Sequence, residues 1–378
     1  MSAIAGKSAS AVSAKTPARV ADGRLRILVY ILILALLAVA VIWAQGSLDP
    51  YKRRVLSVGA INVTLAVGLN IIYGYTGQFS LGHAGFMAIG AYTSALLTMS
   101  PAQKAANFFI IPIHPLLANV RLPFLPAVLI GGLLAAVFAV LIGIPVLRLR
   151  DDYLGMATLG FSEIVRVLIN NMQSITNGSL GLKGIPEYAN MYWTFGWAAF
   201  SVIFAMRLAK TSFGRAFMAI REDDIAAEAV GIDLTHHKVE AFAIGAFFAG
   251  VGGALLGHWS SAVDPKMFTM AATFQVLTIV VAGGLGSITG TVIMAFAYAI
   301  AMEALRFIEA PMNLGIIRIP GIPGMRMVLF SVLLLVVILR FRQGLMGQRE
   351  LSIDPILRRI WPRCVAEAPA EAPKGVRG

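Results

Sequence analysis

Side chains that could act as nucleophiles, bases or metal ligands are dispersed along this sequence. Ser80 and His83 come nearest to a catalytic pair, since they lie one helical turn apart, but no third residue that would orient the histidine is evident. The segment Gly77–Gly82 also lacks the GxSxG spacing of a serine hydrolase. The sequence therefore favours a chain that is not an enzyme, with a hydrolase built on Ser80 and His83 as the enzymatic alternative.

No metal site or energy source can be recognised either. None of the histidines forms the i, i+4 pair with an adjacent carboxylate that a helical zinc site needs. The single cysteine, Cys364, excludes an internal disulfide and a cysteine-based metal site. The sequence contains no GxxxxGK[ST] phosphate loop and no dinucleotide-binding fingerprint. We therefore expect no metal and no bound cofactor, and a partner must supply any energy that the chain uses.

The composition indicates where such a chain works. Apolar residues make up 58% of the 378 residues and charged residues only 13%, against about 45–50% and about 25% in a soluble domain. This leaves too little polar surface to cover a water-facing globule, so we expect an all-α, polytopic membrane protein. The net charge of +12 does not indicate nucleic-acid binding, because the basic residues lie in tails and short loops.

Apolar stretches of about 20 residues must cross lipid as helices, since lipid cannot satisfy backbone hydrogen bonds. We expect about 8–10 crossings, with ten as the central estimate, in one helical bundle. The stretches 154–171 and 271–285 are short, and each is a candidate for a broken or re-entrant helix. The expected spans are 27–44, 55–73, 79–99, 124–147, 154–171, 191–207, 239–260, 271–285, 288–308 and 325–340.

The distribution of Lys and Arg gives the chain a direction, because these residues prefer the cytoplasmic side of a membrane. An even number of crossings keeps the N-terminus, the 208–238 loop and the Arg-rich tail after Arg340 inside, although Lys52–Arg54 then lie outside. Three parts are expected. They are a disordered basic cytoplasmic tail (1–25), a transmembrane permease domain (26–343) with a cytoplasmic loop at 208–238, and a cytoplasmic, largely disordered tail (344–378).

Two glycine-rich segments, at residues 74–90 and 283–290, interrupt the expected spans. Glycine permits close helix contact or an unwound break, and a broken helix that lines a cavity can bind a zwitterionic solute. Helix packing alone is the other interpretation, and His83 is equally compatible with an ordinary interior histidine. The polar side chains expected along a solute path are Thr76, Gln78, Ser80, His83, Ser287 and Thr289.

Two Glu/Arg pairs also fall inside the expected spans. Glu163 with Arg166 and Arg306 with Glu309 are spaced i, i+3, which places both partners on one helix face. An unpaired charge at mid-bilayer costs about 2.5–3.5 kcal/mol on insertion scales. Mutual neutralisation is therefore the expected role of each pair.

The longest polar segment, 208–238, has the features of a short helix. The cluster Glu222–Asp224 suits a helix start, where the macrodipole is positive, and Gly231 suits its end. Such a helix between two spans can move them when a partner pushes on it, although an ordinary solvated loop has a similar composition. The residues expected to act together are Arg221, Glu222, Asp223, Asp224, Ala226, Ala227 and Gly231.

The stretch Arg221–Gly231 resembles the EAA-type coupling loop of ATP-binding cassette (ABC) importer permeases, whose core is Glu-Ala-Ala, three residues and Gly. Ala226, Ala227 and Gly231 match this core, whereas Ile225 replaces the glutamate and the acids are displaced toward the N-terminus. Such a departure is usual in one branch of these proteins, the LivM-type permeases of branched-chain amino acid importers.

Four further segments are similar to the same branch, and they follow in the same order. They are Gly74–Tyr92, Tyr153–Val165, Thr176–Pro186 and Val281–Gly290. The resemblance covers roughly residues 50–340, and it does not extend to the tails.

The resemblance implies a multi-pass permease subunit in the bacterial inner (cytoplasmic) membrane. Its implied partners are a second homologous permease, two cytoplasmic ATPase subunits that bind the ATP, and a periplasmic solute-binding protein. Residues 221–231 would receive the ATPase movement, and leucine, isoleucine or valine would be carried inward. Permeases for urea, another amino acid or a small organic acid have a similar pattern. A self-sufficient secondary carrier or channel is the alternative from another class.

Overall fold

The computed structural model describes residues 23–149 and 151–309, and beyond them 312–313, 318–319, 324–325, 328–332, 340, 344–347 and 350. The chain divides into two compact units, Met1–Ala40 with Leu351–Gly378, and Val41–Glu350. Helix α1 (Gly23–Ser47) starts in the first unit, and all later elements belong to the second. The expected tails lie outside the described residues over 1–22 and 351–378.

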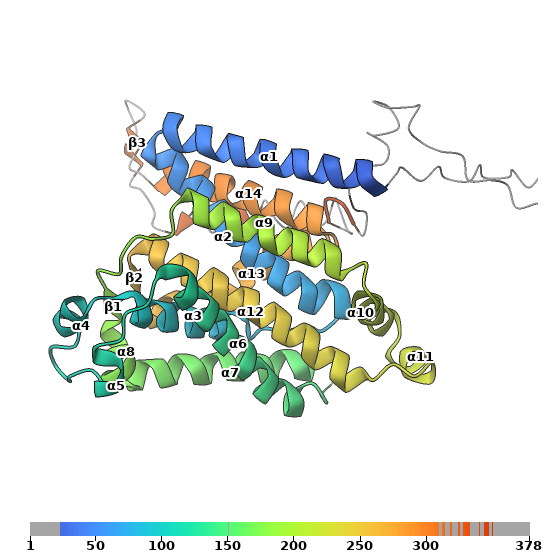
Figure 1. Ribbon diagram of the computed structural model, residues 1–378, viewed down its shortest axis with the longest axis horizontal. Helices are drawn as coiled ribbons and strands as arrows, with labels where there is room; N and C mark the ends of the chain where they lie inside the picture. The colour runs from blue at the N-terminus through green and yellow to red at the C-terminus, as the bar shows by residue number, and fades with distance from the viewer. Residues whose placement is uncertain are drawn as a thin grey trace, which may run out of the picture. The chain divides into compact units, whose positions relative to one another are not determined.

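Long apolar helices dominate the second unit, which confirms the all-α, polytopic class (Figure 1). A six-residue π-helix, η1 (Asn70–Tyr75), directly continues α2. The long helices are α2 (Pro50–Leu69), α3 (His83–Thr98), α6 (Phe124–Val146), α7 (Asp151–Asn171), α9 (Met191–Leu208), α12 (Leu234–Ser260), α13 (Met270–Gly283) and α14 (Ile288–Ala304).

Shorter elements connect these helices. The short α-helices are α4 (Pro101–Asn107), α5 (Pro115–Ala118), α8 (Gln173–Thr176), α10 (Ser212–Glu222) and α11 (Asp224–Ala229). The 3-10 turns are η2 (Gly178–Leu180), η3 (Pro265–Met267) and η4 (Leu305–Glu309). Two antiparallel strand pairs join β1 (Leu182–Lys183) to β2 (Ala262–Val263), and β3 (Met312–Asn313) to β4 (Arg318–Ile319).

The described helices follow the expected spans closely. Within the part of the chain that the structure describes, four helical stretches are long and apolar enough to cross a membrane: Pro50–Tyr75, Phe124–Val146, Leu234–Ser260 and Pro265–Gly283. Helix α7 has 21 residues, a length of about 31 Å, so it is no half-helix against a hydrocarbon core of about 30 Å. Helix α13 has only 14 residues, as its broken sequence predicts. The expected span at 325–340 lies largely outside the described residues.

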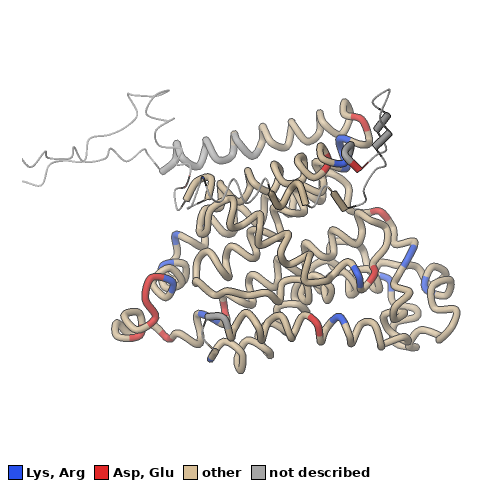
Figure 2. The backbone as a smooth tube through the Cα atoms, turned by 180° about the vertical axis from the view of Figure 1, so that it is seen from behind, with Lys and Arg blue, Asp and Glu red and all other residues tan. Residues whose placement is uncertain are grey.

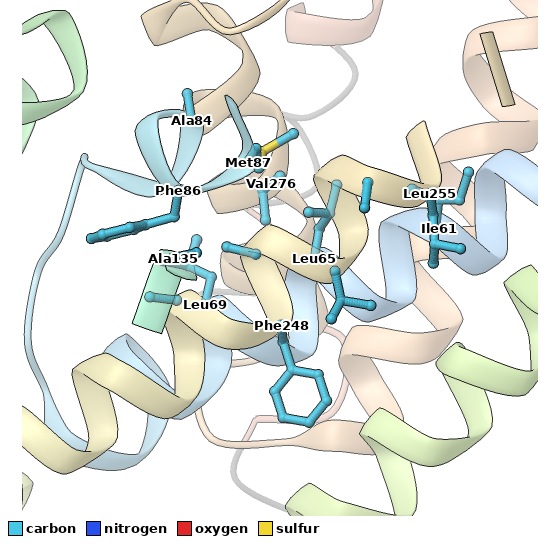
Figure 3. Packing of buried hydrophobic residues seen from close by; sticks show 14 of the residues in the cluster. Ile61, Leu65, Leu69, Ala84, Phe86, Met87, Ala135, Phe248, Leu255 and Val276 are labelled. Carbon is cyan, nitrogen blue, oxygen red and sulfur yellow. The ribbon is translucent and has the colours of Figure 1, made fainter. Parts of the chain in front are cut away.

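Helices α2 and α12 form the centre of the second unit. Helix α12 packs against α2, α3 and α6, and α2 also packs against α9 and α14 (Figure 1). Figure 3 shows the buried side chains where these helices meet, among them Leu65 and Leu69 of α2 with Phe248 and Leu255 of α12. Because α2 leads directly into the first glycine-rich segment, that segment starts from the most buried part of the bundle.

Helices α3, α6 and α12 approach one another closely where they carry glycine. A Cβ atom at Gly90 of α3 would overlap the backbone of Gly250 in α12, and one at Gly131 of α6 would lie 2.9 Å from the Gly90 carbonyl oxygen. Small residues let membrane helices approach backbone to backbone. At Gly90, therefore, glycine serves helix packing rather than a break.

Helix α6 shows what an outward-facing helix of this bundle looks like. Only 39% of its most apolar 18-residue stretch is buried, against 83% for the corresponding stretch of α2 and η1. Its side chains Leu133 and Leu141 are 61% and 62% exposed. Figure 2 shows most of the described Lys, Arg, Asp and Glu residues near helix ends and in connecting segments. This apolar exposure is suited to lipid rather than to water.

The close crossing at Gly90 leads to a testable prediction. We expect Gly90→Ala to destabilise the protein by about 1–3 kcal/mol, because the new methyl group must push α12 away. Gly196→Ala in α9 is the matched control, since a Cβ there meets no atom within 4 Å, and it should be neutral or stabilising. Thermal unfolding in detergent measures both variants, and equal melting temperatures would contradict the close contact.

Candidate functional site

The first glycine-rich segment contains an unwound, non-helical stretch between η1 and α3, which we call the first break. Residues 77–82 are not helical, and Gly77 has φ +72°, a conformation that favours glycine. Side chains of neighbouring helices bind the freed backbone: Thr158 Oγ1 of α7 accepts from the Leu81 amide (2.9 Å), and Thr273 Oγ1 of α13 accepts from the Ala84 amide (3.0 Å). The break is thus held by hydrogen bonds from two other helices.

The second glycine-rich segment forms a shorter break between α13 and α14. Gly284 and Gly286 both have positive φ, at +117° and +84°. Ser287 is the N-cap of α14, where its side-chain oxygen accepts from the Gly290 amide at 3.1 Å. Both glycine-rich segments therefore interrupt helices, as the sequence predicted, and a new helix begins after each.

Asn70, the first residue of η1, joins the π-helix that precedes the first break to the second break. Its Nδ2 donates to the Ser287 carbonyl oxygen and to Thr291 Oγ1, both at 3.1 Å. Its Oδ1 accepts from the Gly286 amide at 2.9 Å. The side chain is 1% exposed, so these bonds are shielded from water.

Arg221, the penultimate residue of α10, reaches the same place from the 208–238 segment. Its Nη1 donates to the Gly74 carbonyl oxygen of η1 at 2.7 Å. The same nitrogen lies 2.7 Å from where a Cβ on Gly286 would stand, so glycine makes room for it. We call the group of Asn70, Gly74, Arg221, Gly286 and Ser287 the glycine junction.

The 208–238 segment contains two short helices rather than one. The N-cap of α11 is Asp223, whose Oδ1 accepts from the amides of Ile225 (2.9 Å) and Ala226 (3.0 Å). Glu222, at the end of α10, pairs with Arg221 at 2.6 Å, and Asp224 pairs with Lys238 of α12 at 2.7 Å. Each acid of the cluster thus has a separate structural role.

Gly231 ends α11 as the sequence predicts. It has φ +88°, its amide donates to the Glu228 carbonyl at 2.9 Å, and the Ile232 amide donates to the Ala227 carbonyl at 3.1 Å. This pair of bonds is the Schellman pattern of a helix C-terminus.

Helix α11 buries one side and exposes apolar residues on the other. Ala227 is buried, whereas Ile225 and Val230 are 74% and 78% exposed, and Ala226 is exposed beside them. Exposed apolar residues on a short polar segment are typical of a contact surface.

Thr76 and Gln78, two of the residues expected along a solute path, are buried in the first break. Gln78 Nε2 donates to Thr76 Oγ1 (2.8 Å) and to the Lys238 carbonyl oxygen near the start of α12 (3.2 Å). They therefore tie the break to the 208–238 side of the bundle. The Oε1 atom of Gln78 is buried without a hydrogen-bond partner among the described residues.

Ser80 and His83 do not form a catalytic pair. Ser80 Oγ accepts from the Gly82 amide at 3.3 Å. Neither ring nitrogen of His83 makes a well-formed hydrogen bond with a described residue, although the Leu65 carbonyl faces the ring. Without a bond between nucleophile and base, the geometry gives no support to a hydrolase.

Ser287 and Thr289, the remaining expected path residues, lie at the start of α14. The amide of Thr289 donates to a Glu350 carboxylate oxygen at 3.2 Å, and its hydroxyl contacts the same oxygen. The Leu345 amide donates to the Ala282 carbonyl at 2.9 Å. Residues 344–347 and Glu350 therefore contact the second break, which sequence reasoning missed because no periodic pattern marks it.

The six expected path residues thus fall into two groups around the glycine junction, and all but Thr289 are buried. Their hydrogen bonds hold the breaks in place. Among the described residues no group of three or more His, Cys, Asp or Glu could hold a metal ion. The arrangement links the positions of several helices to one another.

Comparison with known proteins identifies similar chains. The family described as "Branched-chain amino acid transport system / permease component" matches residues 53–338. The high-affinity branched-chain amino acid transport system permease protein LivM of Salmonella typhimurium is 34% identical over 312 residues, which cover 72% of this chain and 68% of that protein.

More distant relatives cover much of the chain as well. The probable branched-chain amino acid transport permease protein LivM of Methanocaldococcus jannaschii is 24% identical, over 83% of this chain and 98% of that protein. The permease protein LivH of Escherichia coli is 28% identical, over 66% of this chain and 83% of that protein. No solved structure matches the chain.

The hydrogen bonds of Asn70 lead to a prediction about the glycine junction. Asn70→Ala removes the partners of two amide or hydroxyl groups and one carbonyl, so we expect a loss of about 1–3 kcal/mol in stability. Asn62→Ala in α2, the helix that η1 continues, is the matched control, because Asn62 is also buried and its Nδ2 has no partner among the described residues. Thermal unfolding in detergent compares the two, and a larger loss for Asn62→Ala would contradict the bridge.

Proposed function

Since the chain belongs to the family of branched-chain amino acid transport permeases, we propose that it is the membrane-spanning subunit of an ABC importer. It carries leucine, isoleucine or valine into the cytoplasm across the bacterial inner membrane. It pairs with a second, homologous permease and receives its solute from a periplasmic binding protein. Two cytoplasmic ATPase subunits bind and hydrolyse the ATP.

The exposed face of α11 is suited to receive the ATPase. Ile225, Ala226 and Val230 offer an apolar surface, and the Asp223 cap and the Gly231 terminus hold the helix in one conformation. The Asp224–Lys238 ion pair connects α11 to α12, the central helix of the bundle. A push on α11 would therefore act on α12 directly.

One observation carries the proposal: the hydrogen bond from Arg221 Nη1 to the Gly74 carbonyl oxygen. It connects the helices of the 208–238 segment to a π-helix that leads into a break. Asn70 of the same π-helix holds the second break. Movement of α10 can therefore displace η1 through Arg221, and η1 can in turn displace the second break through Asn70.

Reconstitution in liposomes tests the proposed function. The chain is assembled with its partner permease, ATPases and binding protein, and uptake of labelled leucine is measured with ATP and without it. We expect uptake only in the complete, ATP-supplied assembly. Leucine uptake by the permease subunits alone would contradict the proposal and indicate a self-sufficient carrier.

The coupling role of Arg221 makes a separate prediction. Arg221→Gln should lower leucine uptake about ten-fold or more while ATP hydrolysis continues, because a charge-assisted bond to the broken helix is lost. Arg215→Gln is the matched control on the same helix, since Arg215 is exposed and bonds only to the nearby Lys210 carbonyl. Parallel loss of uptake and ATP hydrolysis in Arg221→Gln would point to failed assembly instead.

A further inference from the structure

Helix α7 carries the Glu163–Arg166 pair within a segment long enough to cross the bilayer. The two residues lie only about 3 Å and about 8 Å along the helix axis from its middle residue, Phe161. As the sequence predicts, they pair with each other: Arg166 Nε and Nη2 lie 2.8 and 2.7 Å from Glu163 Oε2. Both nitrogens thus converge on a single carboxylate oxygen.

The pair is only half satisfied. No hydrogen bond joins Glu163 Oε1 or Arg166 Nη1 to another described residue, and the two side chains remain 41% and 34% exposed. Charged residues inside membrane proteins almost always face the bundle interior or a water-filled cavity, because lipid cannot solvate them. We therefore expect the open side of this pair to face a water-filled space or another protein surface rather than lipid.

The surroundings of the pair offer both space and apolar contact. Gly160 lies one turn before Glu163, and a Cβ there would meet no atom within 4 Å. Ile164 and Val167 are 60% and 49% exposed on the same helix face. Among the described residues, one face of α7 therefore presents a carboxylate oxygen and a guanidinium nitrogen without hydrogen-bond partners, aliphatic side chains and the open space beside the exposed Gly160.

We propose that this face of α7 binds the zwitterionic head group of the transported amino acid, an inference that rests on the proposed function. Arg166 Nη1 donates to the substrate carboxylate, and Glu163 Oε1 accepts from its ammonium group. The aliphatic substrate side chain lies against Ile164 and Val167, in the space that Gly160 leaves. A neutral pair that meets a neutral zwitterion keeps the total charge of the site at zero at every stage.

The Glu163–Arg166 pair fits the chemistry of the solute better than the buried polar residues of the two breaks do. Ser80, His83 and Ser287 are at most 2% exposed, so they would contact a solute only after the breaks open. The α7 pair is accessible without such a change. A carboxylate and an ammonium group need partners of opposite charge, and a Glu/Arg pair supplies both.

Single and double neutralising variants test the proposal in the reconstituted importer. Glu163→Gln and Arg166→Gln should each lower leucine uptake at least ten-fold, equivalent to about 1.4 kcal/mol. The double variant should stay equally impaired, because both contacts to the substrate are absent. If the pair only neutralises itself, the double variant removes both charges together and recovers uptake near the wild-type level, which overturns the proposal.

A second Glu/Arg pair in the chain provides the matched control. The structure pairs Arg306 with Glu303, at 3.1 Å, whereas Glu309 accepts from the Gly324 amide. Glu303 and Arg306 have the same residue types and spacing as the α7 pair, but they lie where α14 ends and η4 begins, and Glu303 also accepts a hydrogen bond from the Tyr51 hydroxyl. The double variant Glu303→Gln/Arg306→Gln should transport leucine much as the wild type does, and losses equal to those of the α7 double variant would overturn the proposal.

Gly160→Leu tests the space beside the pair. The Cβ of the new side chain would meet no atom within 4 Å, and Gly160 is exposed, so we expect an unchanged melting temperature and lost uptake. Co-purification of the second permease is measured for every variant. Loss of that partner would show that the face is a subunit contact, and would overturn substrate binding there.

The outcome for the wild type separates the two proposals. Leucine uptake by the wild-type assembly, together with equal uptake by the α7 double variant, overturns only the binding site. Absence of leucine uptake by the complete wild-type assembly overturns the proposed function and the binding site with it.

Discussion

Backbone groups set free by a broken helix must find partners inside a membrane protein, because lipid offers none. The two breaks of this chain meet that requirement mostly with side chains from distant helices. Asn70 acts as donor and acceptor for the second break, while Thr158 and Thr273 accept amides from the first. The positions of α3, α7, α13 and α14 therefore depend on one another through a few hydrogen bonds.

The same requirement applies to the π-helix that precedes the first break. The Gly74 carbonyl of the π-helix accepts from Arg221, a residue outside the long helices. A regular helix would have engaged that carbonyl internally. The irregular end of the span therefore provides the point at which α10 is attached to the bundle.

Local patterns in the sequence were sufficient to predict the helices, the glycine-rich breaks, the Gly231 terminus and the Glu163–Arg166 pair, because each depends on residues a few positions apart. They could not predict the glycine junction. Asn70 and Ser287 are 217 positions apart, and Arg221 and Gly74 are 147 apart. Which distant side chain binds a freed amide depends on helix packing, and no periodicity records it. The one sequence feature that pointed to this junction was Asn70, a polar amide side chain within an apolar stretch.

The crossing of α3 and α12 at Gly90 and Gly250 has a mechanical consequence. Packed helices usually shift past one another by small side-chain adjustments, but here backbone meets backbone and no rotamer can adjust. Rotamer changes therefore cannot let α3 and α12 slide past one another at this crossing. A displacement of α12 there would carry α3 with it.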